Sequence, residues 1–203
     1  MTYSKIAYFS EPGRQNTDET FLIAKNRALE LGIKTIVVAS ITGETGVRAV
    51  EAFGGFNVIV VSHNTGYAEP NVQQMNSENI KRIKEKGAAI VTTTSAFGGL
   101  SRAMRQASLM PPGSDYVVGD IVANSIRIFG QGVKVACEVA SMAADSGLVR
   151  TDEEIISIAG TNLGLKESAR GADTALVLQP ANVHLFFQTR VKEILCKPRE
   201  LLN

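Results

Sequence analysis

The segment "ASITGETG" places small hydroxyl side chains and glycines directly after a β-branched run. Ser40, Thr42 and Thr45 can donate hydrogen bonds, and Gly43 lets backbone N–H groups converge at the start of a helix, which suits a phosphate. The same residues also suit an ordinary capped turn with Thr42 or Thr45 as the helix N-cap. The segment lacks the lysine of a P-loop and carries an acid, Glu44, so both interpretations stay open.

Four other polar segments also stand where a predicted strand ends. The carboxyl ends of parallel strands meet at one edge of a sheet, and ligands of open α/β sheets bind at that edge where the strand order reverses. We therefore expect all five segments to share one ligand-binding edge. The other four are "FSEPGRQNT", "VSHNTGYAEP", "TTTSAFGG" and "AGTNLG".

These segments supply the candidate ligand-contacting residues. The candidates are Asn16, Thr17, Ser40, Thr42, Gly43, Glu44, Thr45, His63, Asn64, Thr65, Gly160, Thr161 and Asn162.

Several candidates have a simpler structural interpretation. Asn16 and Thr17 can cap the first helix. His63 can donate to a phosphate or can be a solvated loop histidine. Residues 160–162 can contact a ligand or form a glycine-rich turn, and Arg170 can be a phosphate countercharge or a surface arginine.

Aromatic residues and the long helical region have alternatives of the same kind. Tyr67 or Phe97 can stack on a flat ring, although ordinary loop packing is favoured. Cys137 and Glu138 are attributed to packing and solvation. Spacing alone indicates no Ser-His-Asp set, paired-carboxylate set or metal cluster, so the sequence leaves open whether the protein is an enzyme.

Alternating strands and helices must position these loops. A region of helical pattern follows the fourth strand, interrupted at Pro111, Pro112 and Gly130, and a helix or arm is expected at the C-terminus. The alternation predicts one α/β domain over residues 1–203, with a parallel sheet covered on both faces. Strands are predicted at 5–9, 35–40, 57–62, 88–94, 154–160 and 173–180, and helices at 16–32, 46–54, 77–87 and within 100–147.

Composition excludes several classes of protein. A net charge of +1 without charge runs argues against nucleic-acid and membrane partners, and the longest apolar runs are strand-length. The N-terminal segment has no apolar signal core, so a cytoplasmic protein is expected. Cys137 and Cys196 are far apart and outside any Cys-x-x-Cys pair, which favours buried, reduced thiols and argues against structural zinc.

The turn also resembles a known loop. Ser40, Thr42, Gly43 and Thr45 match the phosphate-holding loop of the pyruvate kinase C-terminal domain, except that a basic residue is usual where Glu44 stands. That difference argues against a phosphosugar effector. The whole chain resembles a family of stand-alone archaeal and bacterial proteins, described as pyruvate kinase α/β-domain-like and without an assigned reaction. The matching segments are "YFSEPGRQNTDET", "ELGIKTIVVAS", "MAADSG", "RGADTALVLQPA" and "KEILCKPR".

The resemblance implies more than the residues do. It implies a three-layer α/β/α fold with a mostly parallel, mixed sheet, in which the last strand, "DTALVL", is antiparallel at the edge. It also implies flavin mononucleotide (FMN) in the carboxyl-edge crevice. Pyruvate kinase activity is set aside, because its chemistry belongs to a separate barrel of roughly 200 residues or more.

Three functions follow as hypotheses. The first is binding of FMN or a similar phosphorylated ligand. The second is a flavin-dependent oxidoreductase, in which the cofactor carries the chemistry. The third is a module that senses a phosphorylated metabolite and acts through a homo-oligomer interface, as the resemblance to an effector-binding domain suggests.

Overall fold

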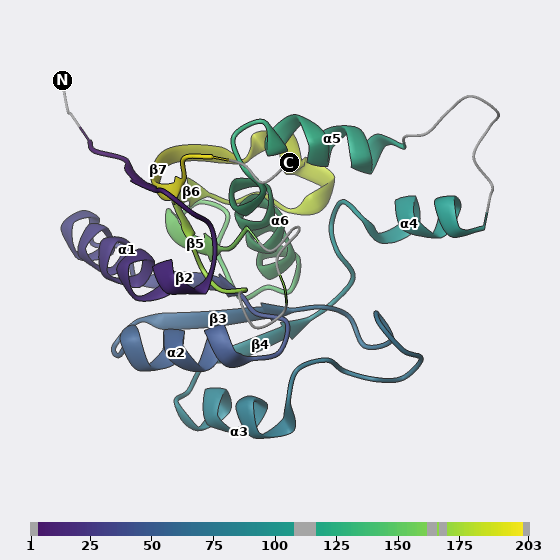
Figure 1. The fold of residues 1–203 in the computed structure, drawn as a ribbon, viewed down its shortest axis with the longest axis horizontal. Helices are drawn as coiled ribbons and strands as arrows, with labels where there is room; N and C mark the ends of the chain where they lie inside the picture. Colours follow the sequence, from purple (N-terminus) through teal and green to yellow (C-terminus); the bar gives the residue numbers. More distant parts are fainter. Residues whose placement is uncertain (1–3, 108–116, 162–165, 167–169, 201–203) are drawn as a thin grey trace.

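The computed structural model describes residues 4–107, 117–161, 166 and 170–200. Within them, one sheet of seven strands runs in the order β1-β7-β6-β5-β2-β3-β4 (Figure 1). The strands span Ala7–Phe9 (β1), Thr35–Ala39 (β2), Asn57–Ser62 (β3), Ala89–Thr92 (β4), Ile155–Ala159 (β5), Thr174–Gln179 (β6) and Arg190–Pro198 (β7). The helices span Thr17–Leu31 (α1), Glu44–Ala52 (α2), Ser77–Glu85 (α3), Gly99–Gln106 (α4), Val118–Arg127 (α5) and Gln131–Asp145 (α6), with 3₁₀ turns at Arg14–Asn16 (η1) and Val183–Gln188 (η3).

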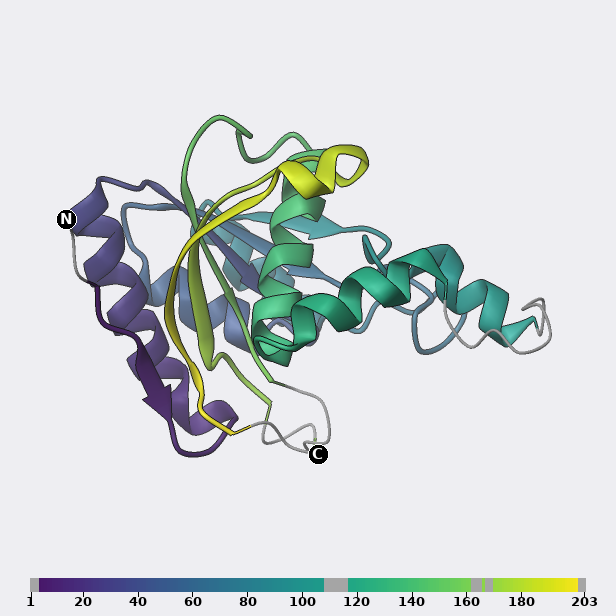
Figure 2. The same ribbon diagram turned by 90° about the horizontal axis from the view of Figure 1, so that it is seen from above.

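Helices cover both faces of the sheet, which confirms the three-layer α/β/α prediction. Phe21 of α1, Val47 of α2 and Ile83 of α3 pack in one core against one face. Ala140 of α6 belongs to a second core on the other face, which includes Val37 of β2. Figure 2 shows α1 and α6 on opposite sides of the strands. The central strands are apolar on both faces because neither face meets water.

Strand direction brings the predicted loops together. β2 pairs in parallel with β3 and β5, β3 pairs in parallel with β4, and β1 pairs in parallel with β7. β6 is antiparallel to both of its neighbours, β5 and β7. The carboxyl ends of β1 to β5 therefore lie at one edge, as the sequence predicts.

The C-terminal part of the sheet differs from the prediction in two ways. β6 is antiparallel, as expected, but it lies inside the sheet and not at its edge. The expected C-terminal helix or arm is instead the strand β7, which pairs with β6 and carries β1 on its other side. The reason is that residues 174–178 are buried throughout, so β6 needs a neighbour on each side.

The reversal of strand order lies between β2 and β5. From β2 the chain adds β3 and β4 outward on one side, then crosses over through α4, α5 and α6 to place β5 on the other side of β2. Gly130, with φ 127°, separates α5 from α6 as predicted. The predicted breaks at Pro111 and Pro112 lie outside the described residues. This reversal point is where ligands of open α/β sheets bind.

Candidate functional site

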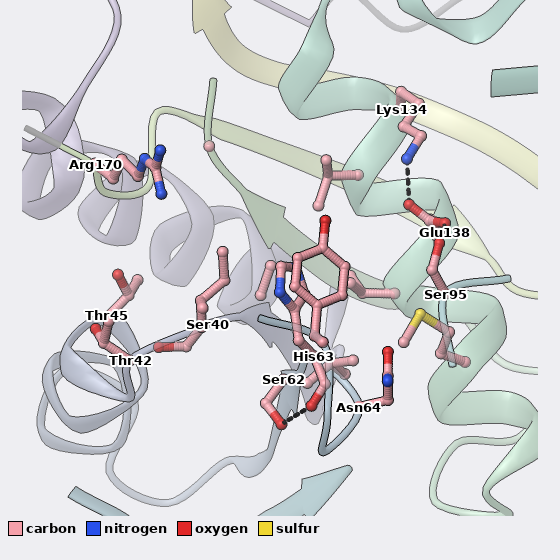
Figure 3. Close-up of a pocket in the computed structure, with 18 of the residues that line it drawn as sticks. Ser40, Thr42, Thr45, Ser62, His63, Asn64, Ser95, Lys134, Glu138 and Arg170 are labelled. Carbon is pink, nitrogen blue, oxygen red and sulfur yellow. Dashed lines mark hydrogen bonds and ion pairs between the residues drawn. The ribbon is translucent and has the colours of Figure 1, made fainter. Parts of the chain in front are cut away.

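A cavity of about 470 Å³ opens at the carboxyl edge, beside the reversal point. Its volume is within the roughly 300–1,000 Å³ of typical small-molecule sites. Figure 3 shows its labelled residues approaching from several sides. The residues that line the cavity come from the loops after β2, β3, β4 and β5, from α2, α4, α5 and α6, and from the segment before β6.

The structure brings many of the predicted site residues together. In the loops after β3 and β5, the neighbouring candidates Thr65 and Thr161 do not line the cavity, and neither does Gly43 in the turn after β2. Asn162 lies outside the described residues. The predicted residues that line the cavity are Ser40, Thr42, Glu44, Thr45, His63, Asn64 and Gly160.

The turn after β2 ends with the N-terminus of α2 at the cavity. Ser40 is held by its own N–H, which donates to the Val61 carbonyl at 2.9 Å, and its hydroxyl accepts from the Gly46 N–H at 3.1 Å. Gly43, with φ 91°, is the N-cap, and no side-chain capping bond is formed there. The alternative interpretation, in which Thr42 or Thr45 caps the helix, is therefore wrong. The Ser40 hydroxyl accepts from the unpaired Gly46 N–H instead, and both threonines line the cavity.

Glu44 has a countercharge of its own. Its carboxylate pairs with Arg14 of η1, with an Nη1–Oε2 distance of 2.9 Å. Both side chains are exposed, so the pair adds little stability. It does balance the negative charge that makes this turn unlike an ordinary phosphate loop.

Asn16 and Thr17 do not line the cavity, and each has a structural hydrogen-bond partner. Asn16 Nδ2 donates to the Glu11 carbonyl at 2.7 Å, and α1 has no side-chain capping bond. The buried Thr17 hydroxyl accepts from the Ala172 N–H at 3.1 Å and lies 3.2 Å from the Ala172 carbonyl. Thr17 thus joins α1 to the segment before β6. It does not cap the helix, as the simpler interpretation of the sequence had it.

Asp173, which sequence reasoning missed, organises two of the loops. Its fully buried carboxylate accepts from the N–H groups of Gly13 at 3.0 Å and Thr161 at 3.0 and 3.1 Å. The hydroxyls of Thr161 and Thr174 also donate to it, at 3.2 and 2.9 Å. Burial raises the pKa of Asp173, and these hydrogen bonds oppose the rise. The loops after β1 and β5 are therefore joined through one carboxylate.

His63 lies in the cavity wall, where its ring contacts Gln74. Its Nδ1 lies 3.0 Å from Gln74 Oε1, a distance at which Nδ1–H donates to that oxygen. Burial lowers the pKa of His63, and Arg102 lowers it further. The His63 and Tyr67 ring centroids are 4.0 Å apart, and the Arg102 guanidinium lies 4.6 Å from the Tyr67 centroid. Tyr67 therefore packs against His63 and Arg102 in the cavity wall.

Helix α6 forms a wall of the cavity that sequence reasoning did not assign to the site. Val135, Val139 and Met142 give it an apolar surface, and Lys134 and Glu138 add a buried charged pair. A Lys and a Glu four residues apart within an otherwise apolar helix was the available signal.

The cysteine prediction and the packing of Phe97 agree with the structure. Cys137 and Cys196 are buried free thiols, and burial raises the pKa of each to about 12. Phe97 is buried and packs edge-to-face on Phe186, with ring centroids 4.8 Å apart, so ordinary packing is confirmed over ring stacking with a ligand. The described residues contain no group of three or more His, Cys, Asp or Glu placed to hold a metal ion.

The charges around the cavity favour an anion. The lining carboxylates are Glu44, paired with Arg14, and Glu138, paired with Lys134. Three arginines also line the cavity, so the cations among its described lining residues outnumber the carboxylates. They are Arg102, Arg127 and Arg170.

A family model matches most of the chain. Residues 18–178 match the family model described as the alpha/beta domain of pyruvate kinase. A crystal structure of an O-ureido-L-serine-bound mutant of O-ureido-L-serine synthase matches at 20% identity and a TM-score of 0.30. That match covers 66% of this chain and 39% of the synthase chain, so the present chain spans about two fifths of that protein. In the described part of the chain, no helix has the length and apolar character that crossing a membrane requires.

Proposed function

Because the chain belongs to the pyruvate kinase alpha/beta domain family, we propose that its carboxyl-edge cavity binds a small molecule with a phosphate at one end and a flat ring at the other. FMN, which the sequence resemblance implies, has this form. The observation that carries the proposal is the cavity itself, which combines a helix N-terminus, excess positive charge and an apolar wall.

The phosphate end is assigned to the turn after β2. The N-terminus of α2 carries partial positive charge and backbone N–H groups, a combination that attracts phosphate. Thr42 and Thr45 line the same end of the cavity and supply hydroxyl donors, and Arg170 adds a cation nearby (Figure 3). The Glu44 carboxylate is already balanced by Arg14, so it does not cancel this field.

The ring end is assigned to α6. Val135, Val139 and Met142 present apolar surface to the cavity, which suits a flat ring. His63 adds a ring nitrogen, Nε2, beyond the one that meets Gln74. The described residues thus fit both parts of FMN, which when bound would supply hydride and one-electron chemistry.

The test is an absorbance spectrum of the freshly purified protein between about 300 and 550 nm, followed by heat release and identification of any chromophore. Two flavin bands from released FMN are expected. A colourless protein that stays colourless after incubation with FMN would contradict the flavin assignment. If flavin is found, bleaching by NADH or NADPH would extend the proposal to an oxidoreductase.

A second candidate function is a sensing module that acts through a homo-oligomer, and the crossover helices favour it. Arg102 of α4 and Arg127 of α5 line the cavity, while Leu100, Val118 and Ile128 on or next to the same helices are 83%, 76% and 73% exposed. These helices therefore carry two of the arginines of the ligand site and exposed apolar side chains that a second copy of the chain could cover. Light scattering with and without FMN tests this function. A sensing module requires that the mass of the oligomer change when FMN is added.

A further inference from the structure

Lys134 and Glu138 form a buried ion pair in the wall of the cavity. Lys134 is 8% exposed and Glu138 is 6% exposed, and both line the cavity. Removing two charges from water is unfavourable, and an apolar pair of the same size is often as stable or more stable. Stability alone therefore does not explain a charged pair at this place, and its position in a ligand cavity points to recognition.

The two partners differ in how far their hydrogen-bonding capacity is used. The Glu138 carboxylate accepts from the Ser95 hydroxyl, from the Phe97 N–H at 3.0 Å and from Lys134. It thus holds the loop after β4 against α6. An ammonium has three donors, and Glu138 is the acceptor that the described structure gives Lys134. Donor capacity of Lys134 remains for a ligand.

The position of Lys134 determines which part of the ligand it can meet. Figure 3 shows Lys134, Glu138 and Ser95 on one side of the cavity and Thr42, Thr45 and Arg170 on the other. A ligand whose phosphate lies at the turn after β2 therefore extends its other end toward Lys134. The group that meets Lys134 must accept hydrogen bonds, because an ammonium is a donor only.

We propose, on the basis of the function proposed above, that Lys134 selects the ring of the ligand by donating to a carbonyl oxygen on it. Rings with a carbonyl edge, such as flavin and uracil, are then favoured over rings that present an amino group there. An amino group would face the ammonium with two sets of donors and leave both unpaired, which is unfavourable in a buried site.

The experiment compares UMP with CMP and adds FMN as a third ligand. UMP and CMP share the phosphate and ribose and differ at one edge of the base, where uracil has the O4 carbonyl and an N3–H donor and cytosine has an amino group and an N3 acceptor. Calorimetry measures the Kd of each for the wild-type protein and for a Lys134→Met, Glu138→Gln double variant. The double variant removes the cation without leaving a lone buried carboxylate, and the introduced amide keeps an oxygen for Ser95 and Phe97. A Lys25→Met variant is the matched control, because Lys25 binds the Ala52 carbonyl and does not line the cavity.

The wild type and Lys25→Met are expected to bind UMP at least about tenfold more tightly than CMP, the ratio that corresponds to one good hydrogen bond. In the double variant, FMN and UMP should weaken by about tenfold and the UMP preference should disappear. Equal binding of FMN by wild type and double variant would overturn the role of Lys134 and leave the flavin assignment intact. UMP binding that depends on Lys134, without any binding of FMN, would overturn the flavin assignment and leave the role of Lys134 intact. Binding of none of the three would overturn both.

Discussion

The backbone N–H of Thr161, which follows β5, is shared between the two carboxylate oxygens of Asp173 at the entry to β6, at 3.0 and 3.1 Å. The same carboxylate accepts from Gly13, so one buried side chain joins loops that are far apart in sequence. Both loops lie at the carboxyl edge of the sheet. Asp173 therefore holds this edge of the cavity in place without lining it.

Replacing Asp173 with Asn should lower the free energy of unfolding by about 1–3 kcal/mol or more, because an amide nitrogen would face a buried N–H donor. Urea unfolding followed by circular dichroism measures the change. Asp152→Asn is the control, since Asp152 is exposed and pairs with Arg150 at the surface. A loss in Asp173→Asn no larger than that of the control would contradict the joining role.

The pH dependence of stability gives a second readout of Asp173. Burial raises its native pKa above the unfolded value of about 3.9, so the native state binds the proton more tightly. The contribution of this group to stability is therefore full below the unfolded pKa and is lost as pH rises through the native pKa. The Asp173→Asn variant should not lose stability as pH rises from the unfolded pKa to the native pKa. Plots of the free energy of unfolding against pH for the wild type and the variant measure this difference.

Gly43 is predicted to tolerate no side chain. It has φ 91°, and a Cβ would lie 2.6 Å from Asn79 Cβ. Gly55 has a similar φ of 88° with nothing within 4 Å, so Gly55→Ala measures backbone strain alone. Gly43→Ala should destabilise the protein by about 1–3 kcal/mol more than Gly55→Ala, since the clash is added to the strain. Equal losses in thermal or urea unfolding would show that the turn moves aside.

The charge state of His63 should respond to its two neighbours in opposite directions. Its pKa is lowered from the ordinary 6.5, mainly by burial, while the Gln74 hydrogen bond raises it and Arg102 lowers it. Gln74→Leu should therefore lower the pKa further and Arg102→Met should raise it. An NMR titration of the imidazole Cε1 proton measures both, with a His184→Gln variant assigning the signal. Shifts of one sign in both variants would contradict the described contacts.

The sign of the stability effect follows from the same shift. The native state binds the His63 proton more weakly than the unfolded chain does, so the neutral ring contributes stability that is full above about pH 6.5. That contribution is lost as pH falls through the lower native pKa.

Variants of Thr45 and Thr65 test whether a site residue must line the cavity to contact the ligand. Both were predicted as site residues, but Thr45 lines the cavity and Thr65 does not. Thr45→Val should weaken FMN binding by about 10- to 100-fold, because a hydrogen bond to a charged phosphate contributes about 1.5–3 kcal/mol. Thr65→Val should leave the Kd unchanged. Fluorescence titration with FMN checks both, and equal effects would place the phosphate away from the turn after β2.

Much of the fold could be predicted because its signals are local. Gly32 ends α1 in a left-handed conformation, and the β-branched run from Ile36 to Val38 forms a fully buried strand, each as the pattern indicates. The family match over residues 18–178 also confirms the resemblance drawn from the sequence. The strand β7 was missed because its Lys, Glu and Leu residues also suit a helix, and only pairing with β6 decides between the two.

The site was predictable where residues share a loop and not where they meet through tertiary structure. Ser40, Thr42 and Thr45 stand together in sequence and line the cavity together. Asp173 joins Gly13 across 160 residues of sequence, and no local pattern shows this. Lys134 was missed for the same reason, because the role of one side of α6 depends on which strands it covers.

The most direct test of the account compares the binding of FMN and riboflavin by the wild-type protein. The two share the ring and differ in the phosphate, so their ratio of Kd values measures the phosphate end alone. Quenching of flavin fluorescence on titration with protein gives both Kd values. FMN is expected to bind at least about tenfold more tightly than riboflavin, and Thr45→Val should reduce that ratio. Equal Kd values, or no quenching by either flavin, would contradict a phosphate-anchored flavin site at the turn after β2.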